Sequence, residues 1–164
     1  MRVTFRFHHI APVLAFAAAS VIAADLPKEG SYDMVACLSG VSKTIVFSPT
    51  HSAMTLEQSG ATLSNPPGGF LDRGTFTCLG MGTSLGQKMT YDLVCEVVVP
   101  DGGKMLSTFS LGRDGKITRE MVAGTGRYEG IVASGIAEAM GTFPSIRPGT
   151  FQSCNHQTGT YKLK

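Results

Sequence analysis

The chain contains no tryptophan, and it has few charged residues and few histidines for its length. Charged side chains make up 16% of the 164 residues, and two of the four histidines, His8 and His9, lie close to the N-terminus. This composition excludes a long coiled coil, which is rich in Glu, Lys and Arg. The length corresponds to one domain with a single core and excludes a two-domain enzyme.

The N-terminal segment has the features of an export signal. Arg2 and Arg6 precede an apolar run, Ile10 to Ala24, that ends in two alanines suited to signal peptidase cleavage. The run is shorter than the roughly 20 residues that a membrane-spanning helix needs. We therefore expect a signal peptide at 1–24 and a periplasmic or secreted domain at 25–164. An uncleaved amphipathic anchor is the alternative.

Removal of this segment changes the charge balance. Arg2 and Arg6 account for two of the 14 basic residues, and the remaining 12 equal the 12 acidic residues, all of which lie beyond the segment. No cluster of basic and aromatic residues stands out along the chain, so we do not expect a nucleic-acid partner.

The four cysteines are an even set, as expected for disulfides in an exported domain. Cys78 and Cys95 flank a glycine-rich turn, whereas Cys37 and Cys154 lie on the first and last expected strands. This arrangement favours pairing of Cys78 with Cys95 and of Cys37 with Cys154, although two other connectivities are possible. Zinc binding is the competing interpretation, but no C-x-x-C pair occurs, so we expect no metal and no cofactor.

Hydrophobic residues alternate with polar ones along most of the chain. From Met89 to Val99 every second residue is apolar, and the segments 31–38, 41–47 and 105–111 show the same alternation. Such a period of two is typical of half-buried strands. Only 135–142 has any helical character, and it is too short and too close to glycines to predict a helix.

Turn sequences separate these segments at short intervals. Pro100–Gly103 and Gly112–Gly115 each contain an Asp-Gly pair, which is typical of tight hairpins, and Asn65–Gly69 predicts a wider loop. About eight or nine strands joined mainly by hairpins favour an all-β fold: a closed or nearly closed antiparallel eight-stranded up-and-down barrel, which removes exposed strand edges. A β-sandwich is the alternative.

Several of these turns resemble those of a known group of proteins. The segments 74–78, 101–104 and 124–131, together with Cys95, resemble uncharacterised exported bacterial proteins. The Gly-Thr-Gly turn at 124–126 also resembles that of allene oxide cyclase and dirigent-type barrels. The resemblance implies a calycin-like eight-stranded barrel with a central apolar cavity, and it carries no catalytic residues onto this chain. The three glycines of 124–130 predict a structural turn, since no phosphate-binding motif follows.

Few residues are candidates for catalysis. His51 and His156 could act as general bases but have no predicted neighbour in common, and Asp92 and Glu96 fall in the polar phase of their strand. Glu138 lies in an apolar stretch, where a buried carboxyl would have a raised pKa, although an outward-facing side chain is the simpler interpretation. We therefore assign no catalytic residue.

Asp72 and Arg73 are neighbouring residues of opposite charge. They could form an ion pair at a barrel mouth, where a solvated pair would be the ordinary arrangement.

The barrel interior is the expected site of function. An eight-stranded barrel has room for a dry core or for one small ligand. The side chains expected to face inward, which would contact a ligand, are Tyr32, Met34, Phe47, Phe76, Met89, Tyr91, Leu93, Met105 and Phe109.

Three functions are compatible with such a domain. The first is non-catalytic binding of a small apolar or amphipathic molecule. The second is a cyclase- or isomerase-type reaction in the apolar cavity. The third is a protein-interaction module that uses an expected long loop, Ser59 to Phe70.

Overall fold

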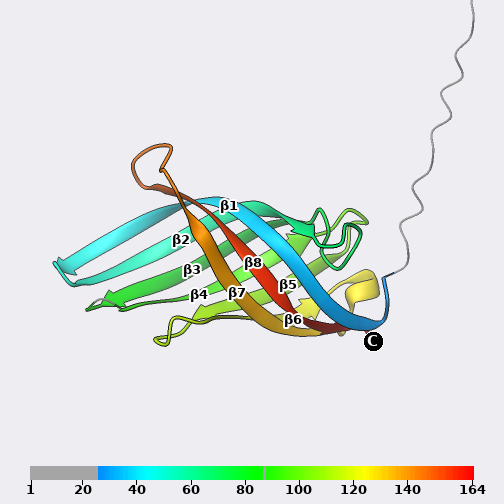
Figure 1. Ribbon diagram of the computed structural model, residues 1–164. Helices are drawn as coiled ribbons and strands as arrows, with labels where there is room; N and C mark the ends of the chain where they lie inside the picture. Colours follow the sequence, from blue (N-terminus) through cyan, green and yellow to red (C-terminus); the bar gives the residue numbers. More distant parts are fainter. Residues whose placement is uncertain (1–25, 87) are drawn as a thin grey trace, which may run out of the picture.

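The computed structural model describes residues 26–86 and 88–164, so the expected signal peptide lies outside the described residues. Eight antiparallel strands form a closed barrel in which every strand pairs with its neighbours in sequence and β8 pairs with β1 (Figure 1). The predicted up-and-down barrel is therefore confirmed. The strands are β1 (Glu29–Ser48), β2 (His51–Ser64), β3 (Thr75–Leu85), β4 (Lys88–Val98), β5 (Lys104–Leu111), β6 (Ile117–Gly124), β7 (Val132–Phe143) and β8 (Thr150–Lys162).

Two disulfides connect neighbouring strands with the favoured pairing. Cys37 faces Cys154 directly across the β1–β8 pair that closes the barrel, and the two form a disulfide. Cys78 and Cys95 face each other across β3 and β4 and form the second. Closure of the barrel thus brings the first and last strands together, as the sequence predicted.

Strand β1 is a single strand of 20 residues, where the alternation predicted two shorter strands at 31–38 and 41–47. Gly40, which falls between these two segments, lies within the strand opposite Phe151. The Phe151 ring fills the space beside the Gly40 backbone: a Cβ on Gly40 would come within 2.5 Å of this ring. The glycine therefore makes room for an aromatic side chain and does not end the strand.

The expected loop at 59–70 is wrong in its first half. Ser59 to Ser64 belong to β2, and the connection to β3 begins at Asn65. Gly60 pairs with Phe76 across β2 and β3, and a Cβ on Gly60 would lie 2.7 Å from the Phe76 ring. As at Gly40, the glycine leaves room for an aromatic ring from the neighbouring strand. Gly60 is therefore part of a strand, although the sequence around it was predicted to be a loop.

A hydrophobic core fills one end of the barrel. Phe70 and Leu71 extend into it from the β2–β3 connection, and the ring of Phe70 stacks on Tyr161 with 4.4 Å between ring centroids. Other members come from the strands and the chain ends: Tyr32, Met34, Val97, Val99, Met105, Met121, Tyr128, Ile131, Ala133 and Leu163. We call this end the closed end; η1 (Gly126–Tyr128) and the C-terminus lie there (Figure 1).

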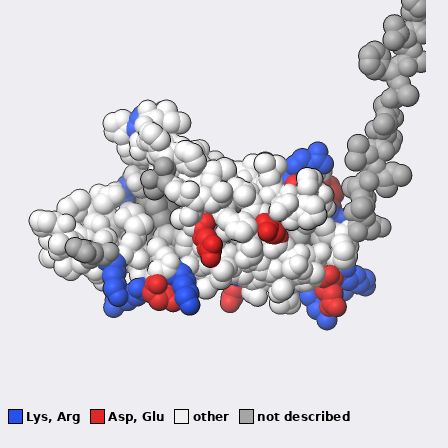
Figure 2. Space-filling model, viewed as in Figure 1, with Lys and Arg blue, Asp and Glu red and all other residues white. Residues whose placement is uncertain are grey.

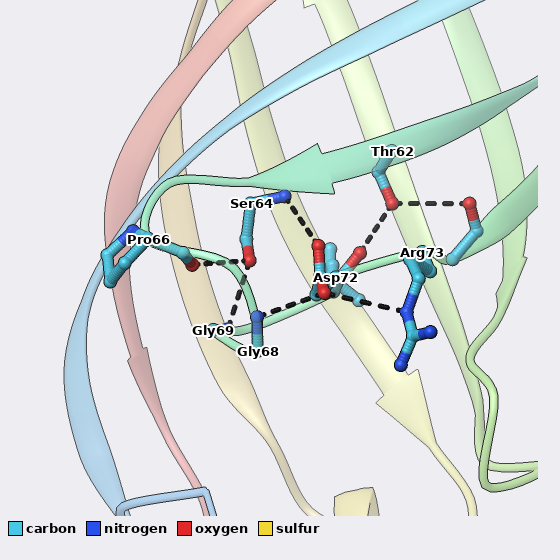
Figure 3. Close-up of polar contacts among 9 residues, drawn as sticks. Thr62, Ser64, Pro66, Gly68, Gly69, Asp72 and Arg73 are labelled. Atoms are coloured by element: carbon cyan, nitrogen blue, oxygen red, sulfur yellow. Dashed lines mark hydrogen bonds and ion pairs between the residues drawn. The ribbon is translucent and has the colours of Figure 1, made fainter. Parts of the chain in front are cut away.

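Asp72 fixes the β2–β3 connection in place at the closed end (Figure 3). Its carboxylate accepts hydrogen bonds from the backbone N–H groups of Ser64, at 3.0 Å, and Gly68, at 2.9 Å. Burial alone would raise the pKa of Asp72, but these N–H groups and the nearby Arg73 stabilise the carboxylate and lower the pKa below its usual value. The connection is therefore an anchored plug, with the side chain of Arg73 in solvent.

The glycine-rich segment before β7 forms a turn, as predicted. Its short helix η1 places Tyr128 in the core, and Arg127 forms an ion pair with Asp101 of the β4–β5 turn at 2.8 Å. The Arg127 guanidinium also donates a hydrogen bond to the Tyr128 hydroxyl at 2.7 Å. These contacts connect two turns at the closed end.

The outer surface carries scattered charge with wide neutral areas between the charged groups on the face seen in Figure 2. In the described part of the chain, no helix has the length and apolar character needed to cross a membrane.

Candidate functional site

The half of the barrel away from the closed end contains a cavity of about 570 Å³. This volume lies within the range of about 300–1,000 Å³ that is typical of small-molecule sites. Its lining is mainly apolar and comes from all eight strands: Leu38, Ser42, Met54, Leu56, Gln58, Thr62, Phe76, Cys78, Met89, Tyr91, Leu93, Cys95, Val97, Phe109, Leu111, Gly115, Ile117, Arg119, Ala137, Ala139, Phe151, Ser153, Asn155 and Gln157.

The inward side chains of β4 show where the cavity opens. Val97, beside the core, is 3% exposed, and Leu93, further along the strand, is 6% exposed. Met89, at the β3–β4 turn, is 41% exposed although it also lines the cavity. The cavity therefore has its floor near the core and its mouth at the end where the β3–β4 turn lies.

The wall beside the floor is stiffened by the inward-facing disulfide. Cys78 and Cys95 are almost fully buried and pack with Leu93, Leu56 and Phe76 in a second apolar cluster. A covalent bond between adjacent strands limits how far this part of the wall can collapse. The disulfide therefore supports the apolar wall beside the cavity floor.

Arg119 is the one charged residue of this lining, and its side chain is almost completely buried, with 3% exposed. One terminal nitrogen donates a hydrogen bond to the Gln157 side-chain oxygen at 3.0 Å. The Nε–H has no hydrogen-bond partner among the described residues. No Asp or Glu of the described chain lies within 4 Å of its nitrogens, so the cation has no counter-ion there.

Two aromatic rings flank this guanidinium. Its central carbon lies 5.3 Å from the ring centroid of Phe109 and 5.8 Å from that of Tyr32. Tyr32 belongs to the core and Phe109 to the cavity wall, so Arg119 lies at the boundary between them. Ring faces attract cations, but they do not use the hydrogen-bond donors of a guanidinium.

Burial changes the acid–base properties of this boundary. Desolvation lowers the pKa of Arg119 to about 10, with a partly compensating effect from the neighbouring Tyr32. The guanidinium therefore keeps its charge at neutral pH. Desolvation also raises the pKa of Tyr32, and likewise of Tyr91 on the cavity wall, so both phenols are neutral there.

Arg119 was not predicted from the sequence as a site residue, because the candidates for acid–base chemistry were histidines and carboxylates. The available signal was the alternation of β6, in which Arg119 shares its phase with Ile117 and Met121, while Thr118 and Glu120 fall in the other. A charged residue in the apolar phase of a strand indicates an inward-facing charge.

Five of the nine expected cavity residues line the cavity: Phe76, Met89, Tyr91, Leu93 and Phe109. Tyr32, Met34 and Met105 face inward but are packed in the core at the closed end. Phe47 is misplaced in the sequence analysis, since its side chain is 87% exposed and lines no part of the cavity. Its assignment followed a separate strand at 41–47, whereas β1 continues the phase of Tyr32 and Met34 past Gly40.

The acid–base candidates lie outside the cavity. His51 is exposed at the β1–β2 turn, where its Nδ1 lies 3.0 Å from the Thr50 hydroxyl. His156 pairs with Asp33 across β1 and β8 at 2.9 Å, with both side chains partly exposed. Glu138 is exposed on β7, as the simpler interpretation held, and belongs to no part of the lining.

Asp92 and Glu96 are exposed on β4, as their polar phase indicated. Asp92 accepts a hydrogen bond from the Ser110 hydroxyl at 2.6 Å. Within the described ranges, no group of three or more His, Cys, Asp or Glu side chains is placed to hold a metal ion.

Comparison with known proteins gives one structural similarity. No protein-family model matches the sequence, and no curated protein matches it significantly. The structure of a pterocarpan synthase dirigent protein aligns with 91% of this chain and 100% of its own, with a TM-score of 0.49 and 12% sequence identity.

Proposed function

We propose that this protein is an exported barrel that binds one small amphipathic molecule in its cavity without transforming it. The observation that carries the proposal is the cavity of about 570 Å³ with an apolar wall, a mouth at one end and a packed core beneath it. A barrel that needed only a stable interior could fill this space with side chains, as its closed end does.

The chemistry of the lining supports binding over an acid–base reaction. The lining contains no Asp, Glu or His, and its titratable groups are Arg119 and Tyr91. Both stay in their ordinary protonation state at neutral pH, because burial leaves the pKa of Arg119 at about 10 and raises that of Tyr91. Neither group is suited to exchange protons there.

Export is part of this proposal. The two disulfides fit an oxidising compartment. The N-terminal sequence, with two arginines before an apolar run, supplies the signal that such a location requires. Mass spectrometry of the protein after expression with its own N-terminus tests the predicted cleavage.

The binding proposal is tested by fluorescence titration with the neutral apolar dye N-phenyl-1-naphthylamine. We expect saturable binding of one dye per chain, with an increase in emission. In the variant Ala139→Trp, an indole would occupy part of the cavity, and we expect at least a tenfold weaker affinity.

The matched control is Ala61→Trp, which adds the same side chain to an exposed position of β2 that does not line the cavity. It should bind the dye as the unaltered protein does. Absence of saturable dye binding, or equal weakening by both substitutions, would contradict the proposal.

A further inference from the structure

We infer that the ligand is an organic anion with an apolar body, and that Arg119 binds its negatively charged head group at the cavity floor. The inference rests on the proposed ligand-binding function and specifies the chemical class of the ligand. A carboxylate is the simplest group of this class.

The positive charge of Arg119 has no counter-ion within the described residues. A buried cation is expensive unless it is paired, and arginines in protein interiors usually have a carboxylate partner. The contacts of Arg119 within the described residues are all neutral: the Gln157 oxygen at 3.0 Å, the hydroxyl and ring of Tyr32, and the ring of Phe109. An incoming anion would supply the missing charge, whereas a neutral ligand would leave it unpaired.

The guanidinium of Arg119 has hydrogen-bonding capacity that the described residues do not use. Arg119 lines the cavity, and its Nε–H is buried without a partner in the described chain. Guanidinium N–H groups bind a carboxylate with two parallel hydrogen bonds, which are among the stronger polar contacts in proteins. Arg119 as a residue lines the cavity, so a ligand head group there would meet a guanidinium with unused hydrogen-bonding capacity.

Two neighbouring side chains, Arg119 and Asn155, hold the amide of Gln157 in one orientation. Its oxygen accepts from Arg119, and its amide nitrogen donates to the Asn155 side-chain oxygen at 2.7 Å. This chain fixes Gln157 with its acceptor toward the guanidinium. The Asn155 amide N–H groups form no hydrogen bond within the described residues and lie on the cavity wall, where they are additional donors for an anion.

The apolar wall of the cavity indicates what the rest of the ligand, beyond its charged head group, is like. Beside Arg119 the wall is formed by Phe109, and further toward the mouth by Tyr91 and the exposed Met89. A ligand with its charge at one end and an apolar chain or ring system behind it would satisfy both regions. A ligand charged at both ends would place its second charge against apolar side chains.

The test compares decanoate with decanol, which have the same chain length but differ in the charge of the head group. Each is used to displace N-phenyl-1-naphthylamine from the unaltered protein, from Arg119→Met and from Arg113→Met. The last variant makes the same substitution at an exposed residue of the β5–β6 turn that is not part of the lining.

We expect Arg119→Met to weaken decanoate binding by roughly 10- to 100-fold, the effect of losing charge-assisted hydrogen bonds. Decanol binding should change less than threefold, and Arg113→Met should alter neither. Equal affinities of the unaltered protein and Arg119→Met for decanoate would overturn the role of Arg119. If the unaltered protein binds none of the three compounds (the dye, decanol and decanoate), the proposed binding function itself is wrong.

A measurement on the unaltered protein keeps the test independent of any variant's folding. In decanoate labelled with ¹³C at its carboxyl carbon, the NMR shift follows the protonation of the bound acid. Contact with Arg119 should lower the carboxyl pKa by about one unit or more relative to the free acid. A raised pKa, which burial without a cation would cause, would overturn the inference. The titratable groups facing Arg119 and the cavity are Tyr32 and Tyr91, and both stay neutral through this titration.

Discussion

Arg119 donates a hydrogen bond to the side-chain oxygen of Gln157 across 3.0 Å, inside a barrel lining that contains no acidic side chain. The pair joins β6 to β8 through the interior, although β7 separates these strands in the sheet. It lies where the packed core ends and the cavity begins. Substitutions of Arg119 and Gln157 should therefore affect the free energy of unfolding and the ligand selectivity of the cavity differently.

Replacement of the charged partner should not destabilise the barrel. Arg119→Met removes a buried cation that lacks a counter-ion and keeps a side chain of similar length. The substitution leaves the Gln157 oxygen without its donor, but it also removes the larger desolvation cost of a buried cation that has no counter-ion in the described chain. We expect the free energy of unfolding, measured by urea denaturation, to be unchanged or higher. A loss of more than about 3 kcal/mol would instead indicate a structural role for the arginine.

Replacement of the neutral partner should have the opposite effect. Gln157→Leu leaves the Arg119 terminal nitrogen without its acceptor, and we expect a loss of about 1–3 kcal/mol in the free energy of unfolding. The double variant Arg119→Met with Gln157→Leu should recover most of this loss. Additive effects of the two substitutions would contradict the coupling between these side chains.

Asp72 should contribute to stability through the plug at the closed end. Asp72→Ala removes both acceptors for the backbone N–H groups of Ser64 and Gly68, and we expect a loss of about 2 kcal/mol. The control Arg73→Met should change stability by less than about 0.5 kcal/mol, because the arginine is largely exposed and its nitrogen lies 3.7 Å from the carboxylate.

The contribution of Asp72 should depend on pH in a defined direction. The pKa of Asp72 in the folded protein lies below the ordinary value of 3.8. The carboxylate therefore stabilises the folded state fully at pH values above the pKa that Asp72 has in the unfolded chain. The contribution is lost as the pH falls through the lower, folded-state value. Urea denaturation at several pH values should show the gap between the unaltered protein and Asp72→Ala closing in strong acid. A constant gap would contradict the assignment.

The two disulfides should differ in their response to reductant. Cys37 is exposed on the outer face, whereas Cys78 and Cys95 are almost fully buried in the cavity wall. Because a thiolate must reach the sulfur atom, dithiothreitol should reduce the Cys37–Cys154 bond first. Alkylation followed by peptide mapping measures the order. Earlier loss of the Cys78–Cys95 bond would show that the cavity wall opens more readily than the outer face.

Removal of the closing disulfide should be costly. The Cys37–Cys154 bond connects residues 117 positions apart, and chain-entropy arguments give such a crosslink about 4–5 kcal/mol. Replacement of both cysteines with alanine should lower the urea midpoint accordingly. An unchanged midpoint would show that β1–β8 pairing alone closes the barrel.

The barrel and its inward faces could be predicted from the sequence because alternation is a local property. The odd positions from Met89 to Val97 face the interior as the alternation indicates, and Met105 to Leu111 follow the same rule. The favoured disulfides followed from the same picture, since closure places the first strand beside the last. The direction in which a strand side chain points could be predicted because it depends on the alternation of its neighbours in sequence.

The depth of each inward side chain could not be predicted. Tyr32 and Tyr91 both alternate correctly, but Tyr32 is in the core and Tyr91 is on the cavity wall. That difference depends on the plug around Phe70 and on glycines such as Gly60, whose place opposite Phe76 is set by the strand register. Register is a long-range property of the sheet, and for the same reason the continuation of β1 past Gly40 and of β2 past Gly60 could not be predicted.

The most direct test of the account is native mass spectrometry of the exported protein, compared with its denatured, non-reduced mass. The account predicts a surplus mass of one small molecule per chain that disappears on denaturation. It also predicts that this surplus is lost from Ala139→Trp and retained in Ala61→Trp. A native mass equal to the denatured mass, in preparations whose cavity also fails to bind N-phenyl-1-naphthylamine, would contradict a ligand-binding barrel.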